Sequence, residues 1–255
     1  MHIKSVRPAA IATATAVAFG IVLVTLSACG GIPKRGVPGP PAAVVRASPA
    51  ARPGPAVPVG DPAGLPGIGE RLHGAIPADS GQVVAVYGEA ADSADSTVVL
   101  YSREADGWRP EGSWPAHNGR HGWTTDHYAG DGRSPVGVFT VTDAGGVLPD
   151  PGTRLSYDRG EAAYTPPHYW DLAHQHDFDY VIAIDYNRLR GTPPNDPTRP
   201  WGVGRGGSIW LHLDHGSGTS ACIGLSREAM EFLLRTLDPD RDPVVVMGDR
   251  VRLSA

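Results

Sequence analysis

Cysteine is scarce in this chain of 255 residues, which contains only Cys29 and Cys222. Two cysteines exclude the multi-disulfide framework that stabilises many small exported proteins. If Cys29 is modified, a single thiol remains, and an unpaired thiol in an exported protein is either an intermolecular bridge or a reactive group. A buried, inert cysteine is the plain alternative, so the residues around Cys222 must distinguish these cases.

The chain also lacks an excess of positive charge, with 22 Lys and Arg residues against 27 Asp and Glu residues. Residues 1–67 carry six of the basic residues and one acid, so the remainder has a net charge of −10. An acidic body repels the phosphate backbone, which argues against nucleic acid as a partner. No GxxxxGK[ST] phosphate loop and no HExxH zinc motif occurs in the sequence.

The first 29 residues have the pattern of a secretory signal peptide. Lys4 and Arg7 give a positive start, an uncharged apolar stretch runs from Pro8 to Leu26, and the segment closes with Leu-Ser-Ala-Cys29. This ending resembles a bacterial lipobox, in which the cysteine is lipidated and becomes the new N-terminus. We therefore predict a signal peptide over residues 1–29 and a membrane anchor at Cys29. An uncleaved membrane helix and ordinary cleaved secretion are the alternatives.

Residues 30–67 are rich in proline, glycine and alanine, with ten prolines in 38 positions. They show no helical or alternating hydrophobic period, so we predict a semi-rigid tether. The folded domain is then expected to start near Ile68 and to occupy residues 68–255.

Short β-rich runs dominate the predicted domain. Residues 82–87 and 97–102 predict a hairpin, and four more strands are expected at 137–142, 180–186, 208–213 and 244–247. One helix is clear, because Ser226 can cap it and apolar residues recur at helical spacing as far as Leu237. The pattern predicts a mainly β (α+β) domain with one or two short helices.

The most informative stretch runs from residue 206 to residue 226. A predicted strand delivers His212, a loop of small residues follows, and Cys222 comes just ahead of the predicted helix. Thiols attack carbonyls as thiolates, and a nearby imidazole and a helix N-terminus both favour that form. Backbone N–H groups of small residues can surround an oxyanion, as acyl transfer requires. The pattern predicts Cys222 as a nucleophile and His212 as its base.

Other groups compete for chemistry in this region. His215 lies closer to the cysteine in sequence and is the second candidate base, with an exposed loop histidine as the alternative. Several loop histidines and nearby acids could chelate zinc: His168, His174, His176, Asp171, Asp177 and Asp179. Loop histidines that stack or face solvent are commoner than metal ligands, so we predict no metal and no cofactor.

Two segments resemble the YkuD-type L,D-transpeptidase catalytic domain. The first is His212 at a strand end followed by Thr219-Ser-Ala-Cys222-Ile223. The second is Gly130-Asp-Gly-Arg-Ser-Pro-Val-Gly-Val-Phe139, which is similar to the family segment Gly-Asp-Gly-x-Thr-Pro-x-Gly-x-Phe. Asn118-Gly119 and Tyr186-Asn187 also fit. The resemblance spans roughly residues 83–248 and implies a β-sandwich-like catalytic fold.

Three positions depart from the family pattern. Ala221 stands where glycine is usual, Ser220 where histidine is frequent, and Gly224 where arginine is frequent. A methyl group at position 221 either crowds the oxyanion pocket or is harmless if φ is negative. These departures resemble a divergent branch of the family and bear on substrate preference more than on the Cys–His chemistry.

The resemblance implies cysteine-dependent acyl transfer on peptidoglycan stem peptides. Cys222 would attack the carbonyl at the L-centre of the diamino acid in position three, and the thioester would pass to an amine or to water. The products would be those of an L,D-transpeptidase or an L,D-carboxypeptidase. His212 would accept the thiol proton while a backbone carbonyl orients its other ring nitrogen.

The remaining expectations follow from the same resemblance. Oxyanion or substrate contacts are expected at Ala221, Thr219, Ser220 and Gly216, with His215 and Asn187 as weaker candidates. The chain would be extracytoplasmic, lipid-anchored at Cys29 and facing the cell wall. The alternative is a non-catalytic, wall-binding lipoprotein that retains the fold.

Overall fold

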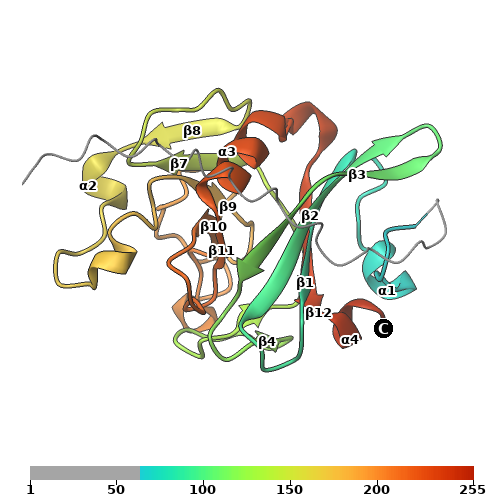
Figure 1. Cartoon of the computed structure of the whole chain (residues 1–255), viewed down its shortest axis with the longest axis horizontal. Coiled ribbons are helices and arrows are strands. Elements are labelled where there is room, and N and C mark those ends of the chain that lie inside the picture. Colours follow the sequence, from blue (N-terminus) through green and yellow to red (C-terminus); the bar gives the residue numbers. More distant parts are fainter. Residues whose placement is uncertain (1–63) are drawn as a thin grey trace, which may run out of the picture. The chain divides into compact units, whose positions relative to one another are not determined.

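The computed structural model describes residues 64–255 (Figure 1). Cys29, the predicted signal peptide and all but the last four residues of the predicted tether lie outside the described residues. In the described part, no helix combines the length and the apolar character needed to cross a membrane.

The structure is mostly β, as the sequence predicts. Ten strands form one sheet: β1 (Gln82–Gly88), β2 (Asp95–Glu104), β3 (Gly107–His117), β6 (Gly137–Thr140), β7 (Asp143–Gly146), β8 (Ser156–Arg159), β9 (Val181–Ala183), β10 (Trp210–Leu213), β11 (Ile223–Leu225) and β12 (Val244–Asp249). Their order across the sheet is β6-β12-β1-β2-β3-β11-β10-β9-β7-β8. The strands β4 (Trp123–Thr124) and β5 (Ser134–Pro135) form a separate parallel pair.

The helices are few and short. They are α1 (Glu70–His73), α2 (Glu161–Tyr164), α3 (Arg227–Thr236) and α4 (Arg250–Leu253), with 3-10 turns at Leu172–His174, Val203–Arg205 and Pro239–Arg241. The helix predicted after Ser226 is confirmed as α3, since the Ser226 hydroxyl accepts a hydrogen bond from the N–H of Ala229. A cap of this kind satisfies one of the N–H groups that a helix start leaves unpaired.

Strand β1 separates two hydrophobic clusters. It lies between parallel β12 and antiparallel β2 (Figure 1), and every residue of it is buried. Val84 and Val86 face the larger cluster, which α3 completes, whereas Val83 and Ala85 face a smaller cluster under α1 and α4. Because side chains alternate across a strand, one continuous apolar run supplies both clusters.

The packed part of the chain begins slightly before the expected start at Ile68. The Leu65 side chain is 3% exposed and belongs to the smaller cluster. The Tyr87 hydroxyl donates a hydrogen bond of 2.7 Å to the carbonyl of Pro66. The last residues of the predicted tether therefore contribute to the core.

Each of the six predicted β-rich runs contains an observed strand. The observed strands without a predicted counterpart are β3, β4, β5, β7, β8 and β11, and β3 is the longest of them. Its sequence is largely polar and contains Pro110 and Pro115, which usually argue against a strand. On the side away from β2, only Ala116 and His117 of this strand pair with β11. The prolines therefore lie where that side needs no N–H donor.

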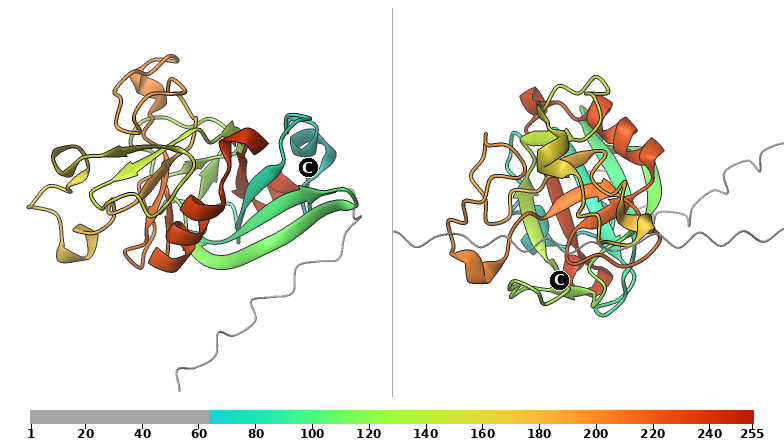
Figure 2. Two further views of the ribbon diagram at one scale, coloured as in Figure 1. Left: turned by 90° about the horizontal axis from the view of Figure 1, so that it is seen from above. Right: turned by 90° about the vertical axis from the view of Figure 1, so that its left-hand side faces the viewer.

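The three strands β9, β10 and β11 position the candidate site. Strand β10 pairs antiparallel with β9 and parallel with β11, and His212 of β10 lies opposite Gly224. The long segment between β9 and β10, orange in Figure 2, projects away from the strands as irregular loops around a short 3-10 turn. The loop between β10 and β11 is much shorter and ends at Cys222.

Candidate active site

A pocket of about 500 Å³ contains both residues of the predicted catalytic pair. Its walls come from the loop of residues 169–178, from β10 with the loop that follows it, and from Arg120. His212 and Cys222 both line this pocket. Two groups that can exchange a proton with a bound substrate therefore share one cavity.

The thiol of Cys222 is held by the backbone that precedes β10. Its Sγ accepts a hydrogen bond of 3.4 Å from the N–H of Trp210, and the S–H group donates to the carbonyl of Ser208 at 3.5 Å. Burial raises the pKa of the Cys222 thiol to about 11, more than the hydrogen bond from Trp210 lowers it. The Cys222 thiol is therefore protonated at neutral pH.

An unpredicted strand separates Cys222 from the helix that follows it. Residues Ile223–Leu225 form β11, which is buried and pairs with β10 and β3. Helix α3 starts only at Arg227, so its N-terminus does not begin at the thiol. A short buried run of this kind fits a strand that is covered on both faces, and four residues lie between Cys222 and the start of the helix.

The imidazole of His212 is fixed in one tautomer. Its Nδ1 lies 2.8 Å from the carbonyl oxygen of Leu213, which can only accept, so Nδ1 carries the hydrogen and Nε2 keeps its lone pair. The side chain is 3% exposed, and burial lowers its pKa below the ordinary value. His212 is therefore a neutral imidazole near pH 7, with Nε2 able to accept a proton.

Hydrogen bonds to backbone carbonyl groups hold the loop of residues 219–222 in place. The hydroxyl of buried Ser134 donates a hydrogen bond of 2.6 Å to the carbonyl of Ala221 and accepts one of 2.9 Å from the N–H of Gly119. Because a trans peptide points its N–H opposite its C=O, the N–H of Cys222 is directed away from Ser134.

Thr219 holds the same loop from within. Its hydroxyl donates to the carbonyl of Cys222 at 2.7 Å, and its N–H donates to the carbonyl of Asn118 at 2.9 Å. The carbonyl of Thr219 accepts from the N–H of Arg120 at 2.8 Å. The segment that contains Asn118 thus lies alongside the loop that precedes Cys222, and Thr219 holds that loop in place through these contacts.

The close approach of these segments requires glycine at position 119. A Cβ atom there would lie 2.6 Å from the carbonyl oxygen of Gly132 and 2.7 Å from the nitrogen of Ser134. Real Cβ contacts of that length to backbone essentially never occur. The Asn118-Gly119 and Gly130–Phe139 segments are far from Cys222 in sequence. They nevertheless pack closely together and contact the loop that precedes Cys222.

Two departures from the family pattern have a clear structural account. Ala221 is 6% exposed and packs in the larger hydrophobic cluster. Its φ is not among the positive values of the described non-glycine residues, so its methyl group is accommodated. At Gly224, a Cβ would lie 2.7 Å from Oδ1 of Asp214, whose carboxylate accepts a hydrogen bond of 2.9 Å from His117. The His117–Asp214 pair therefore occupies the space next to Gly224.

The other expected loop residues differ in position. Ser220 is exposed and lines the pocket, whereas Gly216 is an exposed turn residue with φ +82°. Asn187, with φ +46°, donates to the carbonyls of Gly202 and Gly206 and accepts from the N–H of Trp201. Asn187 thus organises the loop between β9 and β10 and is not among the described residues that line the pocket.

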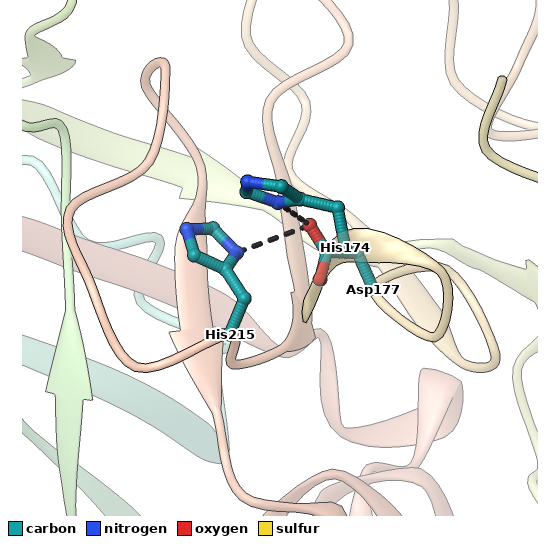
Figure 3. A group of neighbouring side chains, drawn as sticks. All are labelled: His174, Asp177 and His215. Atoms are coloured by element: carbon teal, nitrogen blue, oxygen red, sulfur yellow. Dashed lines mark hydrogen bonds and ion pairs between the residues drawn. The ribbon is translucent and has the colours of Figure 1, made fainter. Parts of the chain in front are cut away.

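His215 lies in a second polar cluster on the pocket wall. Its Nδ1 is 3.0 Å from Oδ2 of Asp177, and Nδ1 of His174 is 2.9 Å from the same oxygen (Figure 3). Burial alone raises the pKa of Asp177, but the hydrogen bonds from the two histidines outweigh it and hold that pKa below its usual range. The hydrogen bond to Asp177 raises the pKa of His215. His215 therefore keeps its proton to a higher pH than His212 does, which favours His212 as the base.

The histidines that the sequence groups together separate in the structure. His168 is exposed, and His176 is 76% exposed and faces Asp179. Of the histidines His168, His174 and His176, only His174 contacts Asp177. The second histidine in the cluster is His215. Ser134 was not predicted as a site residue, although it lies within the motif segment that carries the resemblance.

Comparison with known proteins places these features in context. Residues 91–246 match the family described as the YkuD L,D-transpeptidase catalytic domain. No curated protein matches the chain. Among solved structures, Bdellovibrio bacteriovorus Bd1075 is similar with 14% sequence identity and a TM-score of 0.36, over 66% of this chain and 48% of that one. The chain matches about half the length of that protein.

Proposed function

Because this chain belongs to the YkuD L,D-transpeptidase catalytic-domain family, we propose that it catalyses cysteine-dependent acyl transfer on peptidoglycan stem peptides. Members of this family have L,D-transpeptidase-type functions in the cell wall. The observation that carries the proposal is the shared pocket of Cys222 and His212, in which the Leu213 carbonyl leaves Nε2 of His212 free to accept a proton.

The first step begins from a neutral pair. The Cys222 thiol gives its proton to Nε2 of His212 as its sulfur bonds to the carbonyl carbon at the L-centre of the third residue. The carbon–nitrogen bond to the terminal D-alanine then breaks, and the imidazolium returns the proton to the leaving amine. A thioester on Cys222 and free D-alanine are the products of this half-reaction.

The second half-reaction consumes the thioester. An amine of a neighbouring stem or a water molecule attacks the thioester carbonyl, and His212 accepts the proton of the attacking group. The carbon–sulfur bond then breaks and the imidazolium returns the proton to the Cys222 sulfur, which gives a cross-link with the amine or a shortened stem peptide with water. The exposed rim of the pocket, including Ser220, leaves space for either acceptor. Transpeptidation and carboxypeptidation are therefore two outcomes of one acyl-enzyme.

The anchored loop supports an oxyanion role for the Cys222 backbone. Its N–H is directed away from Ser134, and the carbonyls of Thr219, Ala221 and Cys222 are all engaged by protein donors. A fixed N–H donor stabilises the negative oxygen of the tetrahedral intermediate without needing to reorient. Neighbouring amides of the small-residue loop supply the second donor.

Incubation of the purified chain with tetrapeptide stems tests this proposal. Mass spectrometry should detect loss of D-alanine, a thioester adduct on Cys222, and either cross-linked or shortened stems. Cys222→Ser should abolish all three products, and His176→Ala, a change at an exposed side chain, should leave them intact. Normal turnover by Cys222→Ser would rule out the cysteine mechanism.

A non-catalytic wall-binding role is the second candidate. The raised pKa of the Cys222 thiol favours it, because a protonated thiol is a poor nucleophile. Co-sedimentation with purified peptidoglycan distinguishes the two roles. Binding without any release of D-alanine supports the wall-binding role, and adduct formation on Cys222 excludes it.

We also propose that the chain is exported and lipid-anchored through Cys29. The charged start, the apolar stretch and the Leu-Ser-Ala-Cys29 ending support this proposal. Cys29→Ala should leave the precursor unprocessed or release the protein from the membrane. Unchanged processing and unchanged detergent partitioning of that variant would argue for an uncleaved anchor.

A further inference from the structure

We propose that His174, Asp177 and His215 form a binding site for one divalent transition-metal ion of the zinc class, on the wall of the Cys222 pocket. The site is separate from the cysteine chemistry and does not depend on the proposed acyl transfer. Its three donors are nitrogen and oxygen atoms from side chains that line the pocket.

The three side chains are held by backbone that is already ordered. His174 ends a 3-10 turn, and the N–H of Asp177 donates to the His174 carbonyl at 3.2 Å. His215 lies 38 positions after Asp177 and follows β10, where the N–H of Leu213 donates to the Asp177 carbonyl at 2.9 Å. The donors are therefore brought together before any ion binds, which lowers the cost of ordering them.

The donor atoms converge on a single point. Both ring nitrogens contact Oδ2 of Asp177, at 2.9 Å from His174 and 3.0 Å from His215, as Figure 3 shows. One ligand atom from each residue lies within 4.8 Å of the others. In a tetrahedral zinc site with bonds of about 2.0–2.1 Å, ligand atoms are about 3.3 Å apart. Movements of a few tenths of an ångström would bring the carboxylate–imidazole separations to that value.

The chemistry of this set suits zinc better than calcium or magnesium. Two imidazoles and one carboxylate are frequent zinc ligands, whereas calcium and magnesium prefer oxygen alone. Three protein ligands leave the fourth position of a tetrahedral ion open. Since all three residues line the pocket, water or a bound molecule can fill that position.

The partners of Asp177 differ from those of the buried acids Asp143 and Asp179. Asp131, which pairs with His127, has one imidazole partner where Asp177 has two. Asp143 pairs with Arg188 at 3.0 Å, and Asp179 pairs with Arg227, so permanent cations neutralise both. Within residues 64–255, the ion-pair partners of Asp177 are the two imidazoles alone. An arginine cannot ligate a metal, but a neutral imidazole can, so this carboxylate keeps partners that are themselves ligands.

The neighbouring pair provides a matched control. His176 and Asp179 repeat the same spacing two residues later, with Nδ1 of His176 at 3.2 Å from Oδ2 of Asp179. His176 is 76% exposed, and Arg227 also binds that carboxylate. Within residues 64–255, no second histidine joins His176 and Asp179 to make a group of three metal ligands. This pair should therefore not hold an ion.

Titration calorimetry with Zn²⁺ on the full chain tests the proposal. Replacement of both Cys29 and Cys222 by alanine removes the thiols, which bind zinc themselves. One ion should bind per thiol-free chain, and His174→Ala and His215→Ala should each weaken binding by on the order of 100-fold. His176→Ala should bind as the thiol-free parent does.

A spectroscopic measurement needs no further variant. Co²⁺ added to the thiol-free chain should give the intense visible absorption of a four-coordinate nitrogen and oxygen site, and Zn²⁺ should displace it. Loss of stoichiometric binding on removal of the thiols would place the ion on cysteine and overturn the proposal. Equal weakening by His176→Ala and His174→Ala would also overturn it. Neither result bears on acyl transfer, which is measured separately with stem peptides.

Discussion

The hydroxyl of Ser134 donates a hydrogen bond of 2.6 Å to the carbonyl of Ala221, the residue before Cys222. The two residues are 87 positions apart in the sequence, and both are buried. Through Gly119, whose N–H binds the same hydroxyl, the contact extends to a third segment. The backbone direction at Cys222 is therefore set by residues that have no role in proton transfer.

Ser134→Ala should loosen this arrangement. Removal of the hydroxyl leaves the buried Ala221 carbonyl and the Gly119 N–H without their partner, which costs about 1–3 kcal/mol of unfolding free energy. Turnover of stem peptides should fall as well. Urea unfolding and product analysis measure the two effects, and Ser113→Ala, at an exposed position of β3, is the control. If Ser134→Ala matched that control in both measurements, the anchoring role would be wrong.

Gly119→Ala should be more damaging than a glycine change elsewhere. Its Cβ would contact backbone atoms of Gly132 and Ser134 at 2.6 and 2.7 Å, which no side-chain rotation relieves. We expect a loss of about 1–3 kcal/mol in unfolding free energy. Gly204→Ala is the comparison, because a Cβ at that position meets no atom within 4 Å. Similar melting temperatures for the two variants would contradict the close-packing argument.

The two candidate bases should titrate on opposite sides of the ordinary value of 6.5. Burial lowers the pKa of His212, so this ring should lose its proton below pH 6.5, while the Asp177 contact raises the pKa of His215 and keeps that ring protonated above it. The acid limb of kcat/KM should therefore lie below pH 6.5. NMR titration of the ring protons, assigned with His212→Ala and His215→Ala, measures both. The reverse order would favour His215 as the base.

Alkylation of Cys222 should be slow at neutral pH and should accelerate with pH. With a pKa of about 11, the thiolate fraction rises about tenfold for each pH unit between 7 and 10. Iodoacetamide labelling of a Cys29→Ala chain followed by mass spectrometry measures this rate. The same chain in urea should label faster at pH 7, because the unfolded thiol has a lower pKa. Rapid labelling of the folded chain that does not change with pH would show a resting thiolate.

Two truncated chains should differ in stability. A chain that begins at residue 64 keeps Leu65 and the Pro66 carbonyl that Tyr87 binds, whereas one that begins at Ile68 loses both. Loss of the buried Leu65 side chain should cost about 1.5–3 kcal/mol. Thermal unfolding of the two chains beside the full chain tests this. Equal melting of all three would place the domain start at Ile68, as the composition of the tether indicates.

The sequence was informative where hydrophobic runs are long. Valine-rich segments predicted β1, β2 and β12, and helical spacing with a capping serine predicted α3. Strand β3 escaped prediction because its partner β2, and not its own polar sequence, makes it a strand. Strand β11 escaped because three apolar residues are too few to distinguish a strand from the start of a helix.

The candidate site also contains features that the sequence predicts and features that it does not. Local pattern together with the family resemblance drew attention to His212 and Cys222, which share the pocket. The grouping of His215 with His174 and Asp177 depends on a contact across 38 positions, and no spacing in the sequence encodes such a contact. The pKa of the Cys222 thiol depends on burial, which the neighbouring residues alone could not show.

The parallel pairing of β10 with β11 limits how far substitutions can move the two candidate residues apart. Leu211 lies opposite Ile223, so His212 and Cys222 directly flank one rung of a hydrogen-bonded ladder. Adjacent strands are about 4.8 Å apart whatever their side chains, so the separation of the two backbone positions depends on the sheet. Substitutions in the loops around the pocket can therefore alter its lining while the sheet keeps the backbone positions of the proposed nucleophile and base in the same register.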